Sequence, residues 1–278
     1  MLNLKEALAS GGALIGTFST SGSPVMVETI GYAGLDFVVL DCEHAAVSPY
    51  GGELAGLIRA AWSADIAPIV RVTWNDPGQI MKALDMGASA VIIPHVNSAE
   101  EAAAAVSAAH HHPKGRRSAT PAVIASQQGL IDWPSHYGRS QEETLVIPLI
   151  EESEGVDRIE EIAAVPNLGG IFFGPFDLAV SMGAGEDARD ADVSEARERV
   201  YAAAKANGLP IFDLAWSAEA ALALIKKGAQ VVAVGVDISL FADGCRVLAA
   251  QCADAKRRAK TTRRRARAVA TALDGSGD

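Results

Sequence analysis

Acidic side chains stand at the ends of two apolar runs that read as neighbouring β-strands in this chain of 278 residues. Glu151 closes Val-Ile-Pro-Leu-Ile-Glu, and Asp177 closes Ile-Phe-Phe-Gly-Pro-Phe-Asp. Two carboxylates, with the remaining positions taken by water and substrate, form the usual site for Mg²⁺ or Mn²⁺. A single acid at such a place could equally cap the next helix. The pair therefore favours a divalent-metal site.

An arginine and a histidine near two other strand ends could act on a substrate at that metal. Arg71 follows Pro-Ile-Val and could bind a carboxylate or stabilise an enolate oxygen, and its alternative role is a structural ion pair. His44 could be a general base near neutral pH if Asp41 or Asp85 orients its ring, although a single histidine is weak evidence. Asp41 and Glu43 are candidates for supporting roles.

The other conspicuous polar residues receive no catalytic role. Asp237 ends the last apolar run as a further strand-end acid. Residues 110–112 are three histidines at the end of a helical pattern, where adjacent side chains point in different directions, so we expect them to be solvated. His95 and His136 have no partner at the spacing of a zinc site, and Cys42 lies outside any nucleophile pattern.

Eight strand-like runs alternate with helical patterns along the chain. This alternation, without a glycine-rich dinucleotide fingerprint after the first strand, predicts an α/β fold of the closed (β/α)8 TIM-barrel type. In such a barrel the catalytic groups project from the carboxyl ends of the strands, where the residues above stand. The expected strands are 13–20, 37–41, 68–72, 90–96, 145–151, 170–177, 210–215 and 231–236.

Glycines at 34, 87, 208 and 228 stand where a helix should stop before the next strand. Two irregular stretches, 113–143 and 182–192, interrupt the rhythm and are expected to be functional or mobile loops. The expected helices are 26–33, 52–64, 77–86, 99–111, 156–164, 193–206, 218–227 and a last one from about 240.

The distribution of charged residues predicts two parts of the chain: a single barrel domain, 1–255, and a basic tail, 256–278. Eight of the 24 Lys and Arg residues lie between 256 and 267, which leaves 16 against 32 Asp and Glu in residues 1–255, a net charge of −16. That body should repel polyanions, so nucleic acid is an unexpected partner. The tail lacks interleaved aromatic residues, and we expect a solvated or disordered end rather than a binding segment.

The cysteines and the apolar runs indicate where in the cell the protein is expected. Cys42, Cys245 and Cys252 have neither the number nor the spacing of a disulfide framework, so a reducing cytoplasm is expected. The first residues lack the pattern of a signal peptide, and every apolar run is too short to span a bilayer. We therefore expect no membrane association.

These motifs, in this order, resemble the HpcH/HpaI family of metal-dependent class II pyruvate aldolases, typified by 4-hydroxy-2-oxoheptanedioate aldolases. The resemblance runs from about residue 15 to residue 249. It rests on Phe-Val-Val-Leu-Asp-Cys-Glu-His at 37–44, Val-Arg-Val-Thr-Trp-Asn-Asp-Pro at 70–77, Ile-Glu at 150–151, Gly-Pro-Phe-Asp-Leu at 174–178 and Ala-Val-Gly-Val-Asp at 233–237.

The resemblance implies a role for each matching residue. Glu151 and Asp177 would hold Mg²⁺ or Mn²⁺, with Co²⁺ as a further option and no organic cofactor. Arg71 would stand beside the enolate oxygen, and His44, held by Asp85, would be the acid/base. The 2-oxo acid would chelate the metal and break at a carbon–carbon bond into pyruvate and an aldehyde. The backbone near Gly174 and Phe176 would contact the pyruvate carboxylate. Relatives commonly form hexamers through the last helix, so a homo-oligomer is expected.

Two departures from the family pattern keep other functions open. Leu149 stands where these aldolases usually carry Gln, and Phe176 where they commonly carry Ala. The first change removes a hydrogen-bonding amide and the second fills volume beside the substrate. The alternatives are another enolate reaction on the same fold, such as oxaloacetate decarboxylation or a biosynthetic condensation, and a non-catalytic barrel scaffold whose basic tail engages a partner.

Overall fold

The computed structural model describes the backbone of residues 2–183 and 191–274. Its contacts divide the chain into two compact units, Met1–Asp237 and Ile238–Asp278. The division falls earlier than the predicted boundary at residue 255, because a single long helix begins at Asp237. Each unit is described by itself below.

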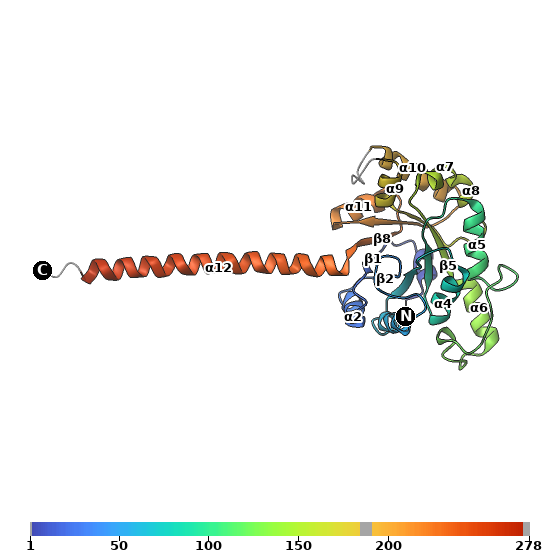
Figure 1. Cartoon of the computed structure of the whole chain (residues 1–278), viewed down its shortest axis with the longest axis horizontal. Helices are drawn as coiled ribbons and strands as arrows, with labels where there is room; N and C mark the ends of the chain where they lie inside the picture. Colours follow the sequence, from blue (N-terminus) through green and yellow to red (C-terminus); the bar gives the residue numbers. More distant parts are fainter. Residues whose placement is uncertain (1, 184–190, 275–278) are drawn as a thin grey trace. The chain divides into compact units, whose positions relative to one another are not determined.

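The first unit is a closed barrel of eight parallel strands that follow one another in sequence order, as predicted. Helices surround the strands (Figure 1). Strand β1 also pairs with β8, which closes the sheet and removes its edges. The strands are β1 (Leu14–Ser19), β2 (Phe37–Asp41), β3 (Ala67–Arg71), β4 (Ala90–Ile93), β5 (Leu145–Ile150), β6 (Ile171–Phe173), β7 (Ile211–Ala215) and β8 (Val231–Val236).

The helices follow the predicted alternation, with additions. Both α1 and α6 lie in segments where no helix was predicted, and the pattern expected over 156–164 forms two short helices, α7 and α8. The helices are α1 (Leu4–Ala9), α2 (Pro24–Tyr32), α3 (Gly52–Ser63), α4 (Pro77–Met86), α5 (Ala99–Ala109), α6 (Trp133–Glu143), α7 (Ser153–Asp157), α8 (Ile159–Ala163), α9 (Pro175–Ser181), α10 (Ala191–Ala206), α11 (Ala218–Lys227) and α12 (Asp237–Asp274).

Helix α4 illustrates how local sequence fixes the element boundaries. The side chain of Asp76 accepts a hydrogen bond from the backbone N–H of Gln79 and caps the amino end. Pro77 occupies the first turn, where its missing N–H costs nothing. Gly87 ends the helix with φ of 102°, a left-handed conformation that favours glycine.

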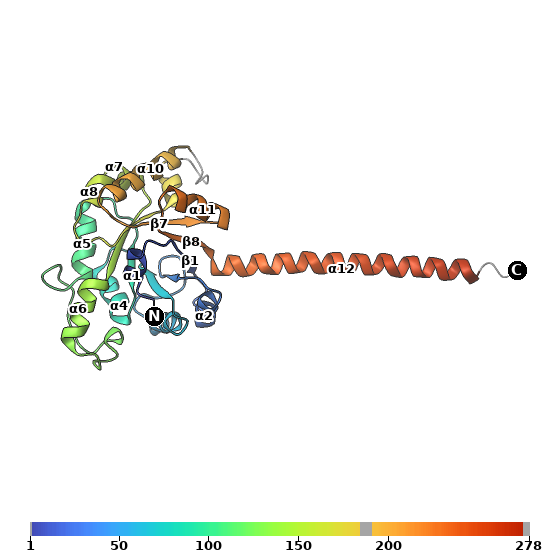
Figure 2. The same cartoon turned by 180° about the vertical axis from the view of Figure 1, so that it is seen from behind.

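Strand residues alternate between two apolar layers. In β2, Phe37 and Val39 belong to the layer inside the barrel, whereas Val38 and Leu40 pack outward against helices. The inner layer is closed at one end by α1, whose Leu4 is 2% exposed (Figure 2). The next inward position of β2 is therefore Asp41, at the opposite, carboxyl end of the strands.

Strand β6 is shorter than predicted and ends at Phe173. Pro175 then starts helix α9, because proline fixes φ and fits the first helical turn. Asp177 consequently lies in the first turn of α9 rather than at the end of a strand. It remains at the carboxyl end of the barrel.

Two of the three histidines at 110–112 are buried, so the expectation of a solvated cluster is wrong for them. His110 and His111 are 2% and 4% exposed, whereas His112 is exposed. Helix α5 ends at residue 109, and the chain folds back so that the Arg117 N–H donates to the His110 carbonyl oxygen at 2.9 Å. The unpredicted helix α6 supplies Tyr137, whose ring stacks on that of His111 at 5.8 Å.

The second unit is helical through Asp274, where the sequence predicted a solvated or disordered end from residue 256. Residues 256–274 are part of this helix. Alanine, arginine and lysine form helices readily even without an apolar face. The described side chains at 256–258 and 260–262 are exposed, in agreement with solvation. Within the described residues, none of the helices has the length and apolar character needed to cross a bilayer.

Candidate active site

Three predicted site residues continue the inward series of their strands. Asp41 follows Phe37 and Val39 in β2, Arg71 closes β3, and Glu151 comes two residues after Leu149 at the end of β5. A period of two places every second side chain on the same face, so all three reach the mouth of the barrel. Asp41 and Glu151 are buried at 1% and 2% exposure.

Arg71 is held by two acids from β2 and the loop after it. Its Nε and Nη2 donate to the two carboxylate oxygens of Asp41 at 2.9 and 2.8 Å. Its Nη1 lies 3.0 Å from Oε2 of Glu43. Burial opposes the charge, but Asp41, Glu43 and Glu151 together raise the pKa of Arg71 above its ordinary value. The guanidinium is therefore a fixed cation at the mouth of the barrel.

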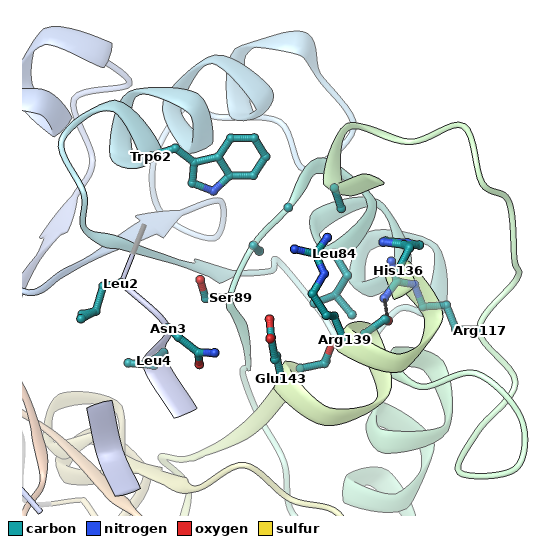
Figure 3. A pocket seen from close by; sticks show the side chains of 15 residues that line it. Leu2, Asn3, Leu4, Trp62, Leu84, Ser89, Arg117, His136, Arg139 and Glu143 are labelled. Atoms are coloured by element: carbon teal, nitrogen blue, oxygen red, sulfur yellow. Dashed lines mark hydrogen bonds between the residues drawn. The ribbon is translucent and has the colours of Figure 1, made fainter. Parts of the chain in front are cut away.

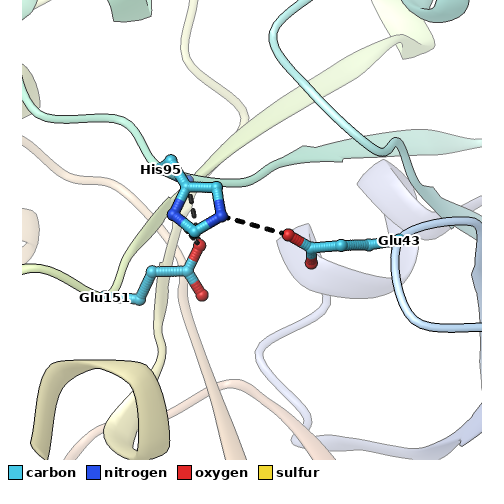
Figure 4. Close-up of side chains that lie close together, drawn as sticks. All are labelled: Glu43, His95 and Glu151. Carbon is cyan, nitrogen blue, oxygen red and sulfur yellow. Dashed lines mark hydrogen bonds and ion pairs between the residues drawn. The ribbon is translucent and has the colours of Figure 1, made fainter. Parts of the chain in front are cut away.

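Glu151, Glu43 and His95 converge although the sequence assigned no role to His95 (Figure 4). The backbone N–H of His95 donates to Oε1 of Glu151 at 2.9 Å. Its ring Nε2 lies 3.3 Å from Oε1 of Glu43, and Nδ1 lies 3.4 Å from Oε1 of Glu151. One signal was available in the sequence, since His95 follows β4 by two residues and so stands at a strand end.

The loop that carries His95 is shaped for this contact. His95 has φ of 56°, a left-handed conformation uncommon for residues other than glycine. Its Nδ1 lies 2.8 Å from Oε1 of Glu152, and its ring packs 5.3 Å from that of Trp74. Burial lowers the pKa of His95, but Glu151, Glu152 and Glu43 outweigh it and raise the pKa above the ordinary value. The imidazole therefore binds a proton more readily among these acids than an ordinary histidine does.

Glu151 is the least hydrated of the converging acids. Burial raises its pKa to about 7, the neighbouring charges of Glu43 and Asp177 add to this rise, and His95 opposes it. Several carboxylates directed at one buried place make a set of oxygen donors that a divalent cation would neutralise. Either Glu151 with Asp177, or Glu43 with His95 and Glu151, could contribute ligands.

Gly174 is required by the packing of Glu151. A Cβ atom at this position would lie 2.7 Å from the Cβ of Glu151. The N–H of Gly174 donates to the carbonyl oxygen of Ile150 at 2.9 Å, so it is occupied within the chain. The N–H groups of Phe176 and Asp177, in the first turn of α9, have no partner four residues earlier in that helix.

A cavity of about 390 Å³ joins these residues at the barrel mouth. Arg71, Glu151, Asp177, Leu149 and Phe176 all line it, as the sequence predicted for one site. His44 also lines it with a side chain that is 63% exposed, and its Nε2 lies 3.8 Å from Oε2 of Glu43. The cavity therefore brings the predicted acid/base, arginine and carboxylates together.

Asp85 lies apart from His44 within the chain, contrary to the pairing that the resemblance implied. Helix α4 starts after β3 at the carboxyl end of the barrel, so Asp85, in its last turn, is at the opposite end. There Oδ1 of Asp85 accepts a hydrogen bond from Nη2 of the buried Arg117 at 2.6 Å. The running direction of the helix, which a motif does not reveal, explains the difference.

A second cavity, of about 360 Å³, lies at that opposite end (Figure 3). Its walls come from the amino-terminal segment, α3, the end of α4 and α6, and include Trp62, Arg117, His136 and Arg139. Of the predicted catalytic residues, it contains none.

Two further polar residues at the carboxyl end have structural explanations. The carboxylate of Asp237 accepts hydrogen bonds from the hydroxyls of Ser19 and Ser21 at 2.8 and 2.6 Å, which ties the end of β8 to that of β1. Burial raises the pKa of the Cys42 thiol to about 12, so the group stays protonated at neutral pH. A protonated thiol is a poor nucleophile.

Comparison with known proteins identifies the family of the chain. The model of the HpcH/HpaI aldolase/citrate lyase family matches residues 14–244. A 5-keto-4-deoxy-D-glucarate aldolase of Salmonella arizonae is 38% identical over 247 residues, which cover 88% of this chain and 94% of that protein. A second such aldolase, of Citrobacter koseri, is 35% identical over the same shares of both chains.

Solved structures give the same result. The citrate synthase SbnG is 34% identical with a TM-score of 0.82, over 94% of this chain and 100% of that one. A family member from Burkholderia cenocepacia J2315 is 30% identical with a TM-score of 0.85, over 90% and 99%. The family match and the aldolase relatives make this protein an enzyme of the carbon–carbon lyase class. The chain belongs to the HpcH/HpaI aldolase/citrate lyase family.

Proposed function

We propose that this enzyme reversibly cleaves a 4-hydroxy-2-oxo acid into pyruvate and an aldehyde with the help of a divalent metal. The observation that carries the proposal is the meeting, in one cavity, of the buried Glu151, the fixed cation Arg71 and the exposed His44. These are an oxygen ligand, a group that stabilises negative charge, and an acid/base. Their side chains come from three different strand ends, which is typical of active sites in this fold.

The residues present fit a divalent cation. We infer that Glu151 and Asp177 hold it, because both line the substrate cavity, whereas Glu43 and His95 are not among the described residues that line it. The oxygen donors suit Mg²⁺ or Mn²⁺, and Co²⁺ is a further option. When bound, such an ion supplies a Lewis acid that polarises the keto group of the substrate. We infer no organic cofactor.

The protein's own groups then account for the movement of charge and protons. His44, whose imidazole is exposed to the cavity, takes the proton of the C4 hydroxyl as the C3–C4 bond breaks. The bonding electrons pass to the pyruvate enolate, and Arg71 stabilises its oxygen. The enolate gains a proton at C3 to give pyruvate, while the aldehyde leaves. We infer that the backbone near Phe176, in the first turn of α9, receives the carboxylate of the oxo acid, as the resemblance implies.

Asp41 and Glu43 act by fixing Arg71. Both oxygens of Asp41 and one oxygen of Glu43 face the guanidinium at 2.8 to 3.0 Å. A planar cation held on two sides needs little reorganisation when negative charge develops on the substrate. Asp85 has no position in this scheme within one chain, and its contribution to His44 remains a prediction from the resemblance.

A second reaction of the same enolate is the alternative. Leu149 is buried two residues before Glu151 and offers no hydrogen bond, and the relative SbnG is a citrate synthase. These observations point to a condensation or to decarboxylation of oxaloacetate. Either reaction would replace cleavage if the enzyme does not turn over 4-hydroxy-2-oxo acids. Leu149→Gln should raise retro-aldol activity if the leucine merely weakens an ordinary aldolase. Lack of any gain would support the altered chemistry.

The test uses the full chain stripped of metal with EDTA and then given Mg²⁺, Mn²⁺ or Co²⁺. Pyruvate release is measured from a panel of 4-hydroxy-2-oxo acids and from oxaloacetate, and exchange of the C3 protons of pyruvate is followed in D₂O. Metal-restored release from a hydroxy-oxo acid supports the aldolase. Release from oxaloacetate alone supports decarboxylation, and the absence of both release and proton exchange overturns the proposal.

We also propose that the enzyme is a homo-oligomer, a hexamer by the resemblance. Apolar side chains of α12, including Ile238, Phe241 and Leu248, are exposed at spacings of three and seven residues along one helix. Such a stripe suits helix packing on another copy. Light scattering should give a molar mass that is a multiple of 28.9 kDa. The double variant Phe241→Glu, Leu248→Glu should have a lower molar mass. A cytoplasmic location stays a prediction from the cysteine pattern.

A further inference from the structure

We propose that the aldehyde half of the substrate carries an uncharged aromatic or branched aliphatic group, rather than several hydroxyls and a second carboxylate. The proposal rests on the proposed function and adds the chemical class of the substrate. It follows from the composition of the cavity, whose metal-binding side is polar and whose remaining wall is apolar.

The apolar wall is the larger part of the cavity lining. Nine of the 16 lining residues have apolar side chains, against six polar ones and Gly174. Leu214 of β7 and Val236 of β8 are only partly buried, so their side chains still present apolar surface there. Phe18 and Leu149 extend this surface below them. An apolar substituent would remove it from water, which is favourable in proportion to the area covered.

Two aromatic side chains form the outer part of this wall. Phe176, from the first turn of α9, and Trp216, in the loop after β7, meet at 5.8 Å with their rings 79° apart. They are 42% and 55% exposed, although both are large and apolar. An edge-to-face pair whose outer ring surfaces are open can pack against a flat or branched apolar group. The pair therefore places the apolar subsite at the solvent-exposed part of the cavity.

Within the described residues of one chain, the apolar wall offers no cation to a charged group. Among the described lining residues, Arg71 is the one lysine or arginine, and three of its nitrogens already face Asp41 and Glu43. The hydroxyl of Thr20 lies 3.4 Å from Oδ1 of Asp237. A second carboxylate would enter this region without a cation, and each unpaired hydroxyl would lose its hydrogen bonds to water. The site thus differs from one built for a polyhydroxy dicarboxylate.

The experiment compares two substrates that share the reacting carbon atoms. One is 4-hydroxy-2-oxo-4-phenylbutanoate, which cleaves to pyruvate and benzaldehyde, and the other is 5-keto-4-deoxy-D-glucarate. We expect kcat/KM for the phenyl substrate to exceed that for the glucarate by about tenfold or more, since apolar pockets discriminate by about this factor. Equal or reversed values, with C3 proton exchange of pyruvate intact, overturn this proposal and leave the proposed function standing. Absence of the exchange overturns both.

Variants at Trp216 show whether the aromatic entrance sets the preference. Trp216→Ala should lower the ratio of the two kcat/KM values about tenfold, and Trp216→Phe should restore most of it. A merely structural effect would reduce both activities together and leave the ratio unchanged, which would overturn the assignment. Tyr32→Ala is the matched control, because Tyr32 is an aromatic residue of α2, 71% exposed, outside the cavity lining.

Discussion

Asp41 and Arg71 stand opposite each other in the parallel register of β2 and β3, and both oxygens of Asp41 accept hydrogen bonds from the guanidinium. The pair is almost completely buried, with 1% of the Asp41 side chain and 11% of the Arg71 side chain exposed. Burying a charge is costly unless its partner is close and well oriented. The strand register therefore both stabilises the arginine and aims it at the cavity.

Asp41→Asn should destabilise the protein by about 3 kcal/mol, because it removes the carboxylate charge that pairs with two nitrogens of the buried guanidinium. It should also lower kcat/KM by about 10²-fold through loss of a preorganised cation. Urea denaturation and steady-state kinetics measure the two effects. Glu160→Gln is the control, since Glu160 makes the same two-oxygen pair with Arg199 at 3.0 and 2.9 Å on the surface. It should change stability by less than about 1 kcal/mol.

Variants of Asp177 and Glu43 test which of these acids is a ligand of the metal. If Glu151 and Asp177 are the ligands, Asp177→Asn should weaken Mn²⁺ binding by tenfold or more, on the order found when a carboxylate ligand is lost. Glu43→Gln should weaken it less, because Glu43 already faces Arg71 and His95. Mn²⁺ electron paramagnetic resonance titration of each variant gives the affinities. The opposite order would place the ion at Glu43, His95 and Glu151.

Metal affinity should depend on pH near neutrality. The pKa of Glu151 in the metal-free chain is raised to about 7, primarily by burial. Below that pH the carboxyl binds a proton that a cation must displace, so the apparent affinity should fall as the pH is lowered from 8 to 6, approaching tenfold per pH unit. Calorimetric titrations in buffers of different ionisation enthalpy should also detect proton release at pH 6. A flat profile across this range would contradict the ligand role of Glu151.

Stability should fall in mild acid because of His110. Burial lowers its pKa to about 4, with Lys114, Arg117 and His111 adding to the effect. An unfolded histidine has a pKa of about 6.5, so between these values the unfolded chain binds more protons and folding weakens as pH falls. The stabilisation is complete above about pH 6.5, and on the order of 2 kcal/mol is lost by pH 4.

The variant His110→Gln tests this directly through the slope of unfolding free energy against pH. The slope between pH 6.5 and 4.5 should flatten, even if the variant is less stable overall. His112→Gln is the matched control, because His112 belongs to the same run and is exposed. Identical slopes for both variants would mean that His110 does not carry the acid sensitivity.

The sequence by itself determined the alternation of strands and helices and the face on which each strand-end residue lies. A period of two in Phe37, Val39 and Asp41 sends all three to one side of the strand, whatever the rest of the chain does. Local capping signals such as Asp76, Pro77 and Gly87 likewise fixed the ends of α4. These features depend on residues a few positions apart, so they can be predicted without knowing the fold in three dimensions.

Only the tertiary structure decided which distant groups meet. The contact of His95 with Glu43 joins loops after different strands, and it required closure of the barrel and a left-handed residue in the loop. Asp85 pairs with Arg117 because α4 returns to the other end, and His110 is buried because the chain folds back beside it. Side-chain distances across a fold depend on loop paths and packing of many elements together. The apolar entrance at Phe176 and Trp216 arises in the same way, because helix α9 and the loop after β7 follow neighbouring strands of the barrel.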